Sequence, residues 1–146
     1  MIMRQNETGP EQYVCFKLSK VMRKVQRYYE QKLTPFDLTP VQFYVFNSLW
    51  RADGQKFKEL AENLHMDGST LTGLLDRMER AGFVERQDDP SDRRSLLIFL
   101  TVKAKEVAPV ILQLAEQFDR DVRKDIPEEK FLIFLEVLDQ LFAGDF

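Results

Sequence analysis

The stretch 57–80, FKELAENLHMDGSTLTGLLDRMER, constrains the fold of this chain most, because it carries two short apolar patterns of helical spacing. The first pattern comprises Phe57, Leu60, Ala61 and Leu64, and the second comprises Leu71, Leu74, Leu75 and Met78. Apolar residues three and four apart lie on one face of a helix. The polar turn between them contains Asp67, which can cap the second helix by accepting the backbone N–H of Thr70. Two short helices joined by a tight turn are typical of a helix-turn-helix.

The outward face of the second helix is built from small polar side chains and one long cation. It comprises Ser69, Thr70, Thr72, Gly73, Asp76 and Arg77. Small hydroxyls and a glycine allow a helix to lie deep in the major groove of DNA, and Arg77 is long enough to reach a phosphate or a guanine. An ordinary helical hairpin with a polar exterior is the alternative at this point.

The residues after this helix have the pattern of a β-hairpin. Gly82 can end the helix in a left-handed conformation. Residues 83–87 and 95–100 have strand patterns. Residues 88–94, DDPSDRR, contain Pro90 and predict an exposed hairpin tip. A β-hairpin directly after a recognition helix predicts a winged helix-turn-helix, a mainly α fold with a small β-hairpin wing.

Five segments of this region together resemble the MarR family of transcription regulators. They are LTPVQFYVF (38–46), ELA (59–61), STLTGLLDRMERAGFVER (69–86), DDPSDRR (88–94) and LT (100–101). The resemblance covers about residues 38–101, and the wing motif is its most specific part. It implies a DNA-binding regulator of transcription, not an enzyme, whose partners are double-stranded DNA and a second copy of the chain.

The predicted DNA-binding residues lie on the recognition helix and the wing. Those expected in the major groove are Ser69, Thr70, Thr72, Gly73 and Arg77. Arg86 is expected to hold the backbone beside the wing. The resemblance implies that Asp92 braces the wing through its arginines, and that Arg94, together with Arg93, reaches the minor groove.

The flanking helices are predicted to form the dimer of a single domain, 1–146, in which 10–36 and 102–146 are dimerisation helices around the winged helix-turn-helix, 38–101. A helix from Pro10 to about Leu33 carries a heptad-like seam of Val14, Leu18, Val21, Val25 and Tyr28. The last helix carries Phe131, Phe134, Leu135, Leu138, Leu141 and Phe142. By resemblance, such helices intertwine with those of a partner subunit, and both stripes suit that interface.

Two further helices have capping residues at their expected N-termini. Thr39, Pro40 and Gln42 form a capping box with proline in the first turn, and the helix that follows is expected to direct Phe43, Phe46, Leu49 and Trp50 inward. Thr101 is expected to cap a long helix that reaches about Lys124.

Composition limits the partners and the compartment. The net charge of −3 means that DNA affinity must come from local basic groups. The basic side chains of the first helix are better explained as its solvated face. We find no signal peptide and no run of apolar residues that could span a bilayer, and one cysteine fits a reducing cytoplasm. The single histidine, His65, lacks companion ligands for a metal, and no cofactor is expected. The first eight or nine residues are polar and expected to be loose.

Cys15 is the one candidate for redox chemistry. Here the resemblance narrows to the OhrR-like organic-hydroperoxide sensors, and it implies that tyrosines of the partner subunit hydrogen-bond to the reactive thiolate. Tyr29 matches one such tyrosine, but Pro40 occupies the second position and cannot donate. Because Cys15 and Tyr29 are about 21 Å apart along one helix, a contact would have to cross the dimer. The alternative is a small residue within the helix packing.

The resulting prediction is a cytoplasmic homodimeric repressor, released from an inverted-repeat operator by a small-molecule effector. Small aromatic or phenolic effectors are implied by the resemblance, and a pocket between the dimer helices and the winged domain would suit them. The alternatives are a one-cysteine peroxide-sensing repressor acting through Cys15, or a winged-helix protein-interaction module. A protein-interaction module would lack arginines at the wing tip. An enzymatic one-cysteine peroxidase would need a βαβ pattern, which the sequence lacks.

Overall fold

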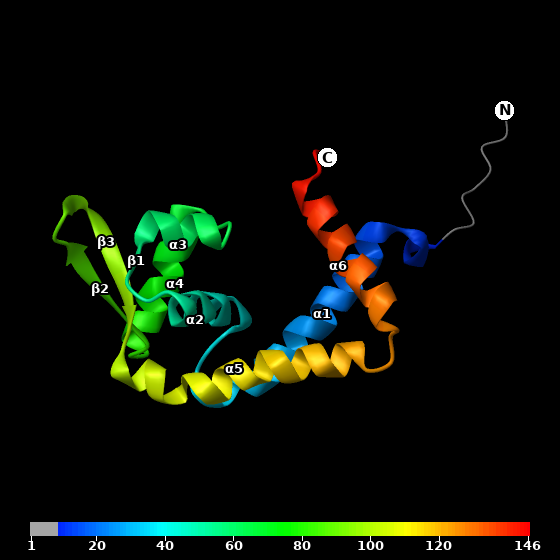
Figure 1. Cartoon of the computed structure of the whole chain (residues 1–146), viewed down its shortest axis with the longest axis horizontal. Helices are drawn as coiled ribbons and strands as arrows, with labels where there is room; N and C mark the ends of the chain where they lie inside the picture. The colour runs from blue at the N-terminus through cyan, green and yellow to red at the C-terminus, as the bar shows by residue number, and fades with distance from the viewer. Residues whose placement is uncertain (1–8) are drawn as a thin grey trace. The chain divides into compact units, whose positions relative to one another are not determined.

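A computed structural model describes residues 9–146 (Figure 1); the expectation of a loose N-terminal segment falls almost wholly outside them. The helices are α1 (Val14–Leu33), α2 (Pro40–Arg51), α3 (Phe57–Asn63), α4 (Gly68–Arg80), α5 (Val102–Arg123) and α6 (Glu128–Ala143). The strands are β1 (Gln55–Lys56), β2 (Val84–Asp89) and β3 (Asp92–Leu100). Two short 3₁₀ turns, Pro10–Gln12 and Thr34–Phe36, precede and follow α1. The strands form one antiparallel sheet in the order β1-β3-β2. The predicted fold class, mainly α with a β-hairpin wing after a helix-turn-helix, is confirmed.

The chain divides into two compact units, one that ends at Ala108 and one that comprises Pro109–Phe146. The first contains α1 to α4, the sheet and the first turns of α5, and the second contains the rest of α5 and α6. The single domain 1–146 expected from the sequence stays a prediction. We describe each unit by itself.

The core of the first unit fills the space between α2, α3, α4 and the sheet. Its fully buried side chains include Phe46, Leu49, Leu60, Leu71, Leu75, Met78 and Ile98. Each such side chain contributes about 1.5–3 kcal/mol to the free energy of unfolding through its burial. The two apolar patterns of the helix-turn-helix therefore meet in one core, which fixes the direction in which the opposite face of α4 points.

Trp50 was expected to point into this core, and that prediction is wrong. Its side chain is 44% exposed, whereas Val45 is fully buried. The buried face of α2 centres on Phe46 and includes Val45 and Leu49. Trp50 lies one residue before the end of α2 at Arg51, at the margin of that face.

The predicted start of the first helix needs a correction. Pro10–Gln12 forms a 3₁₀ turn, which the N–H of Tyr13 closes by donating to the carbonyl of Pro10. The backbone of Tyr13 is extended, so α1 begins only at Val14. The N–H of Tyr13 bonds to the residue three positions back, as in a 3₁₀ turn, whereas an α-helix would need a bond to the residue four positions back.

The wing strands are longer than the sequence indicated. Residues 88–94 were expected as an exposed hairpin tip, but Asp89 pairs with Asp92 across a register shift after Asp88. Asp89 is only 5% exposed, and its Oδ1 accepts hydrogen bonds from the backbone N–H (2.9 Å) and the hydroxyl (2.7 Å) of Ser91. This closed Asx turn confines the tip to Pro90 and Ser91.

The sequence also missed β1. It is two residues long, pairs Gln55 with Ile98, and is too short for an alternating pattern to reveal it. Lys56 on β1 places its Nζ 3.9 Å from Oδ2 of the buried Asp89. Strand β1 therefore links the start of α3 to the wing.

Four predicted caps and turns are confirmed, all of them short-range. Thr39 and Gln42 form a complete capping box. Asp67 caps α4, Gly82 has a φ of 81°, and the hydroxyl of Thr101 accepts the N–H of Ala104 at 3.2 Å.

Apolar side chains remain exposed on α1 and, in the second unit, on α6. Val14 on α1 is 63% exposed, and Leu18 and Val21 are also open to solvent. On α6, Phe134 and Leu141 are exposed and Phe142 is 71% exposed. Within the described residues, no helix combines the length and the apolar character needed to cross a membrane.

Candidate nucleic-acid interface

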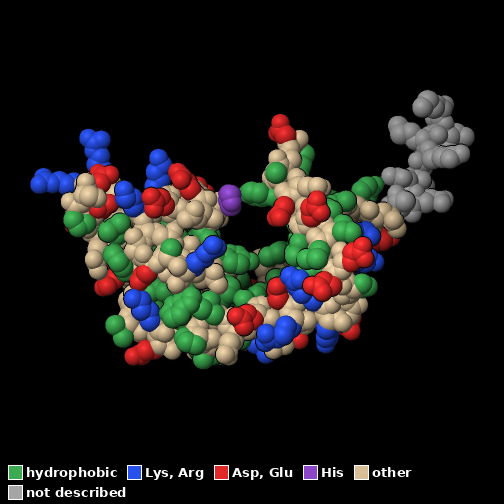
Figure 2. Space-filling view, viewed as in Figure 1, with side chains coloured by type: hydrophobic (Ala, Val, Ile, Leu, Met, Phe, Trp, Pro, Cys, Tyr) green, Lys and Arg blue, Asp and Glu red, His purple; other side chains and the backbone are tan. Residues whose placement is uncertain are grey.

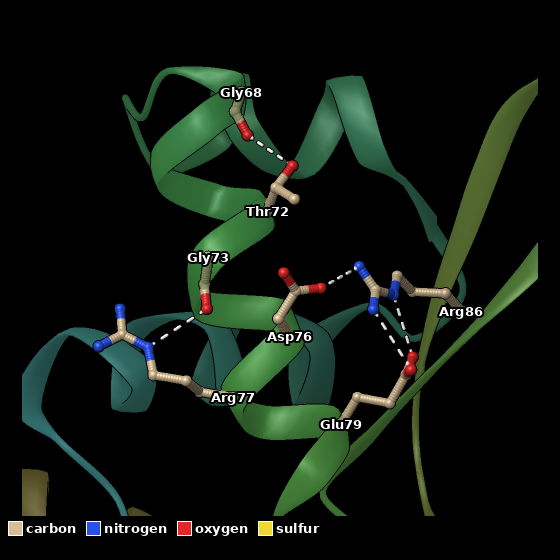
Figure 3. A network of polar contacts seen from close by, with 7 residues as sticks. All are labelled: Gly68, Thr72, Gly73, Asp76, Arg77, Glu79 and Arg86. Carbon is tan, nitrogen blue, oxygen red and sulfur yellow. Dashed lines mark hydrogen bonds and ion pairs between the residues drawn. The ribbon is translucent and has the colours of Figure 1, made fainter.

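The N-terminal turn of α4 holds its hydroxyl side chains in defined positions. Oδ1 of Asp67 accepts the backbone N–H of Thr70 and the hydroxyl of Ser69, both at 2.7 Å, and Oδ2 accepts the hydroxyl of Thr70 at 3.0 Å. These bonds lower the pKa of Asp67, the backbone N–H of Thr70 most of all. The hydroxyl of Thr72 donates to the carbonyl of Gly68 at 2.8 Å (Figure 3). All three hydroxyls are exposed and keep their oxygen lone pairs available to a partner.

Gly73 and Arg77 form the next turn of this face. A methyl group placed on Gly73 would meet no atom within 4 Å, so the absent side chain serves no packing need within the protein. Arg77 is exposed, and its Nε donates to the carbonyl of Gly73 at 3.2 Å, which directs the guanidinium along the helix surface (Figure 3). Together with Arg80 it lines a cavity of about 480 Å³ beside the start of α2.

Arg86 on β2, which was predicted to hold the DNA backbone beside the wing, forms ion pairs within its own chain. Its Nη1 lies 2.7 Å from Oδ1 of Asp76, and its Nε lies 3.0 Å from Oε2 of Glu79 (Figure 3). The hydrogen bonds from Arg86 lower the pKa of Glu79. The guanidinium is thus engaged with α4 within the same chain, and the sequence did not identify Asp76 and Glu79 as its partners.

The wing carries free cations. Arg93 and Arg94 are exposed, and in the described part of the chain neither guanidinium has an ion pair. Basic side chains project from the outer end of the wing in Figure 2. Asp92 was expected to brace the wing through its arginines, and its Oδ1 accepts the backbone N–H of Arg94 at 3.0 Å. This hydrogen bond uses the main chain of Arg94 and leaves its guanidinium available.

Two lysines that the sequence did not single out lie beside Arg94. Lys56 and Lys58 line a shallow cavity of about 410 Å³ together with Arg94 and Ser95. Their position at the start of α3 adds positive charge next to the wing. Cations that flank a recognition helix supply the sequence-independent part of DNA affinity.

The family model for MarR matches residues 38–96. The organic hydroperoxide resistance transcriptional regulator of Bacillus subtilis (strain 168) is 31% identical over 121 residues, which cover 78% of this chain and 82% of that protein. The chain belongs to the MarR family. The HTH-type transcriptional regulator MgrA of Staphylococcus aureus is also 31% identical, over 108 residues that cover 73% of this chain and 74% of that one. A solved structure of overoxidized AbfR bound to DNA is 28% identical, with a TM-score of 0.75 and coverage of 97% of this chain and 98% of that chain.

This MarR-family chain is a DNA-binding transcriptional regulator rather than an enzyme. No cluster of three or more potential metal ligands occurs among residues 9–146. The predicted recognition residues all lie on α4 and the wing, the two elements that give the winged helix-turn-helix its name. Their individual DNA contacts stay predictions.

The redox candidates of this MarR-family protein are separated. Cys15 is exposed in the first turn of α1. Tyr29 is only 9% exposed, and the centroid of its ring lies 5.6 Å from that of Phe43 and 5.5 Å from that of Tyr28. About 21 Å of helix separates the two residues, so one chain does not bring them together.

Proposed function

We propose that this MarR-family regulator is a cytoplasmic homodimeric repressor that binds an inverted-repeat operator and is released from it by a small-molecule effector. The observation that carries the dimer is the exposed apolar stripe on α6, with a second on α1. Apolar surfaces of this extent are costly in water and are normally covered by a partner. Pairing through helices outside the winged helix-turn-helix leaves α4 and the wing of both copies free for DNA.

The proposed operator contacts come from two elements. Ser69, Thr70, Thr72, Gly73 and Arg77 on α4 read the major groove, and Arg93 and Arg94 enter the minor groove beside the wing. Two recognition helices related by a two-fold axis require half-sites about one helical turn, or 10 bp, apart. The small aromatic or phenolic class of effector rests on the family resemblance.

The test is selection of binding sites from random duplex DNA with the purified protein, combined with sedimentation equilibrium. We expect a dimer in solution and a selected inverted repeat, and we expect transcription from a promoter that carries this repeat to fall when the protein is added. A single half-site bound by a monomer would contradict the dimer. A panel of phenols and aromatic carboxylates, added to the complex, then tests the effector class.

A second candidate, peroxide sensing through Cys15, is favoured by the name of the Bacillus subtilis relative and by the exposure of the thiol. It is disfavoured by Pro40, which begins α2 and has no hydroxyl to offer, and by the burial of Tyr29 in the core of its own chain. The unpaired arginines of the wing disfavour the remaining alternative, a protein-interaction winged helix, which would lack them.

A further inference from the structure

The recognition helix α4 carries two carboxylates on the side that faces the wing. Asp76 and Glu79 are three residues apart, so they project from the same face of the helix toward β2 (Figure 3). Both are about half exposed. A negative charge on a DNA-reading helix opposes binding unless it is neutralised, because every phosphate of the duplex repels it.

Arg86 on β2 lies between these two carboxylates and uses all three of its guanidinium nitrogens on them. Nε donates to Oε2 of Glu79 at 3.0 Å, and Nη2 donates to Oε1 of the same carboxylate at 3.3 Å. Nη1 lies 2.7 Å from Oδ1 of Asp76. The planar guanidinium fixes the directions of these bonds, so the arrangement sets both the distance and the orientation between β2 and α4.

The exposure of the three side chains supports the same conclusion. The side chain of Arg86 is 25% exposed, well below either carboxylate. By contrast, Arg93 and Arg94 on the same hairpin are exposed and lack ion pairs within the described residues. The wing therefore carries two kinds of arginine: two directed to solvent and one held against α4.

We propose that Arg86 is a positioning residue, which fixes the wing strand β2 to the recognition helix α4 and neutralises Asp76 and Glu79, instead of contacting the DNA backbone. Helix and wing then meet the duplex as one preformed unit. The inference rests on the proposed role of α4 and the wing as the DNA-contacting elements. The hydrogen bonds from Arg86 lower the pKa of Glu79, which shows that the pairing favours its charged form.

The test compares operator affinity and its salt dependence among four variants: Arg86→Ala, Arg86→Lys, the double variant Asp76→Asn/Glu79→Gln, and the triple variant that combines the double with Arg86→Ala. For Arg86→Ala we expect affinity to fall on the order of tenfold, and more at low salt than at high salt, because salt screens the repulsion between the two unpaired carboxylates and the phosphates.

The lysine variant separates the two roles further. A lysine can replace an arginine at a phosphate, but it cannot hold two carboxylates at three fixed nitrogen positions. We therefore expect Arg86→Lys to lose affinity as well, but with an unchanged salt slope, because lysine keeps the positive charge. Full recovery of affinity by lysine would overturn the proposal.

The triple variant provides the internal control. In Arg86→Ala alone, Asp76 and Glu79 lose their cationic partner and stay charged, whereas in the triple variant both side chains are neutral. Once Asp76 and Glu79 are neutral, removal of Arg86 should cost little additional affinity, so the triple variant should bind DNA better than Arg86→Ala. An equal loss with and without the carboxylates would overturn the proposal. Circular dichroism of each variant establishes that it is folded, and the comparison uses the folded ones.

Arg77→Ala distinguishes failure of this proposal from failure of the proposed DNA surface. If Arg77→Ala weakens binding and Arg86→Ala does not, the positioning role is wrong and the surface stands. If neither substitution affects binding, the assignment of α4 as the reading helix is wrong, and the proposal falls with it.

Discussion

Nζ of Lys103, in the first turn of α5, donates a 2.7 Å hydrogen bond to the carbonyl of Ala81, the C-cap residue that follows the recognition helix α4. The same ammonium lies 4.9 Å from the ring centroid of Phe83. Beside it, the hydroxyl of Thr101 donates to the carbonyl of Gly82 at 2.5 Å. The backbone N–H groups of Ala81, Gly82 and Phe83 already bond to the carbonyls of Arg77, Glu79 and Met78, so the two new bonds extend the cap to the carbonyls that follow α4. A cation at a helix C-terminus also interacts favourably with the helix dipole. The start of α5 therefore closes the end of α4.

Replacement of Lys103 by methionine should lower the free energy of unfolding by about 0.5–1 kcal/mol, because it keeps the aliphatic stem and removes the capping charge. Urea denaturation measures the change. Lys58→Met is the matched control, since Lys58 is exposed and has no ion pair in the described part of the chain; its unfolding should stay within about 0.5 kcal/mol of wild type. Equal effects of the two substitutions would show that the contact with Ala81 contributes nothing.

Substitution of Gly73 by alanine should change stability and DNA binding in opposite directions. Glycine inside a helix costs about 0.5–1 kcal/mol relative to alanine, and the added methyl meets no atom of the protein. The thermal unfolding temperature should therefore rise. Operator affinity should fall, because the methyl occupies the space into which a base edge or phosphate is expected to approach. Unchanged affinity in the stabilised variant would mean that α4 does not approach DNA closely at this turn.

Replacement of Arg94 by alanine should weaken operator binding and lower the salt slope by about 0.9 unit, as expected for the loss of one cation from the DNA. Arg51→Ala, at the end of α2, serves as a control for overall charge and should leave the slope unchanged. Filter binding across a range of salt concentrations measures both. If the two variants had the same slope, the wing arginine would not touch DNA.

Treatment with cumene hydroperoxide and a small thiol should affect the operator affinities of wild type and Cys15→Ser equally. A sensing thiolate would attack the peroxide oxygen and release the alcohol, and the resulting sulfenic acid would condense with the added thiol to give a mixed disulfide and water. Tyr29 packs into its own core and Pro40 lacks a hydroxyl, so the partners that would stabilise such a thiolate are incomplete. Loss of binding by wild type alone would establish Cys15 as the sensor.

The sequence alone determined the features that depend on neighbours three or four residues away. The capping box of Thr39 and Gln42, the cap at Asp67 and the left-handed Gly82 follow from which side chains can reach the adjacent backbone. The apolar spacing on α4 likewise determined which face is buried, and hence which residues are exposed. These features are local, so the rest of the fold has little opportunity to change them.

Only the tertiary structure decided the interactions between distant segments. Arg86 could be read as a DNA contact because its partners, seven and ten residues earlier, become neighbours only when β2 packs on α4. The contact of Lys103 with Ala81 spans 22 residues, and the bond from the backbone N–H of Leu100 to Oδ1 of Asp53 spans 47. A long charged side chain can satisfy its hydrogen bonds with water, DNA or another side chain. Packing of the core determines which of these partners lies within reach, and the spacing of residues in the sequence does not show which one that is.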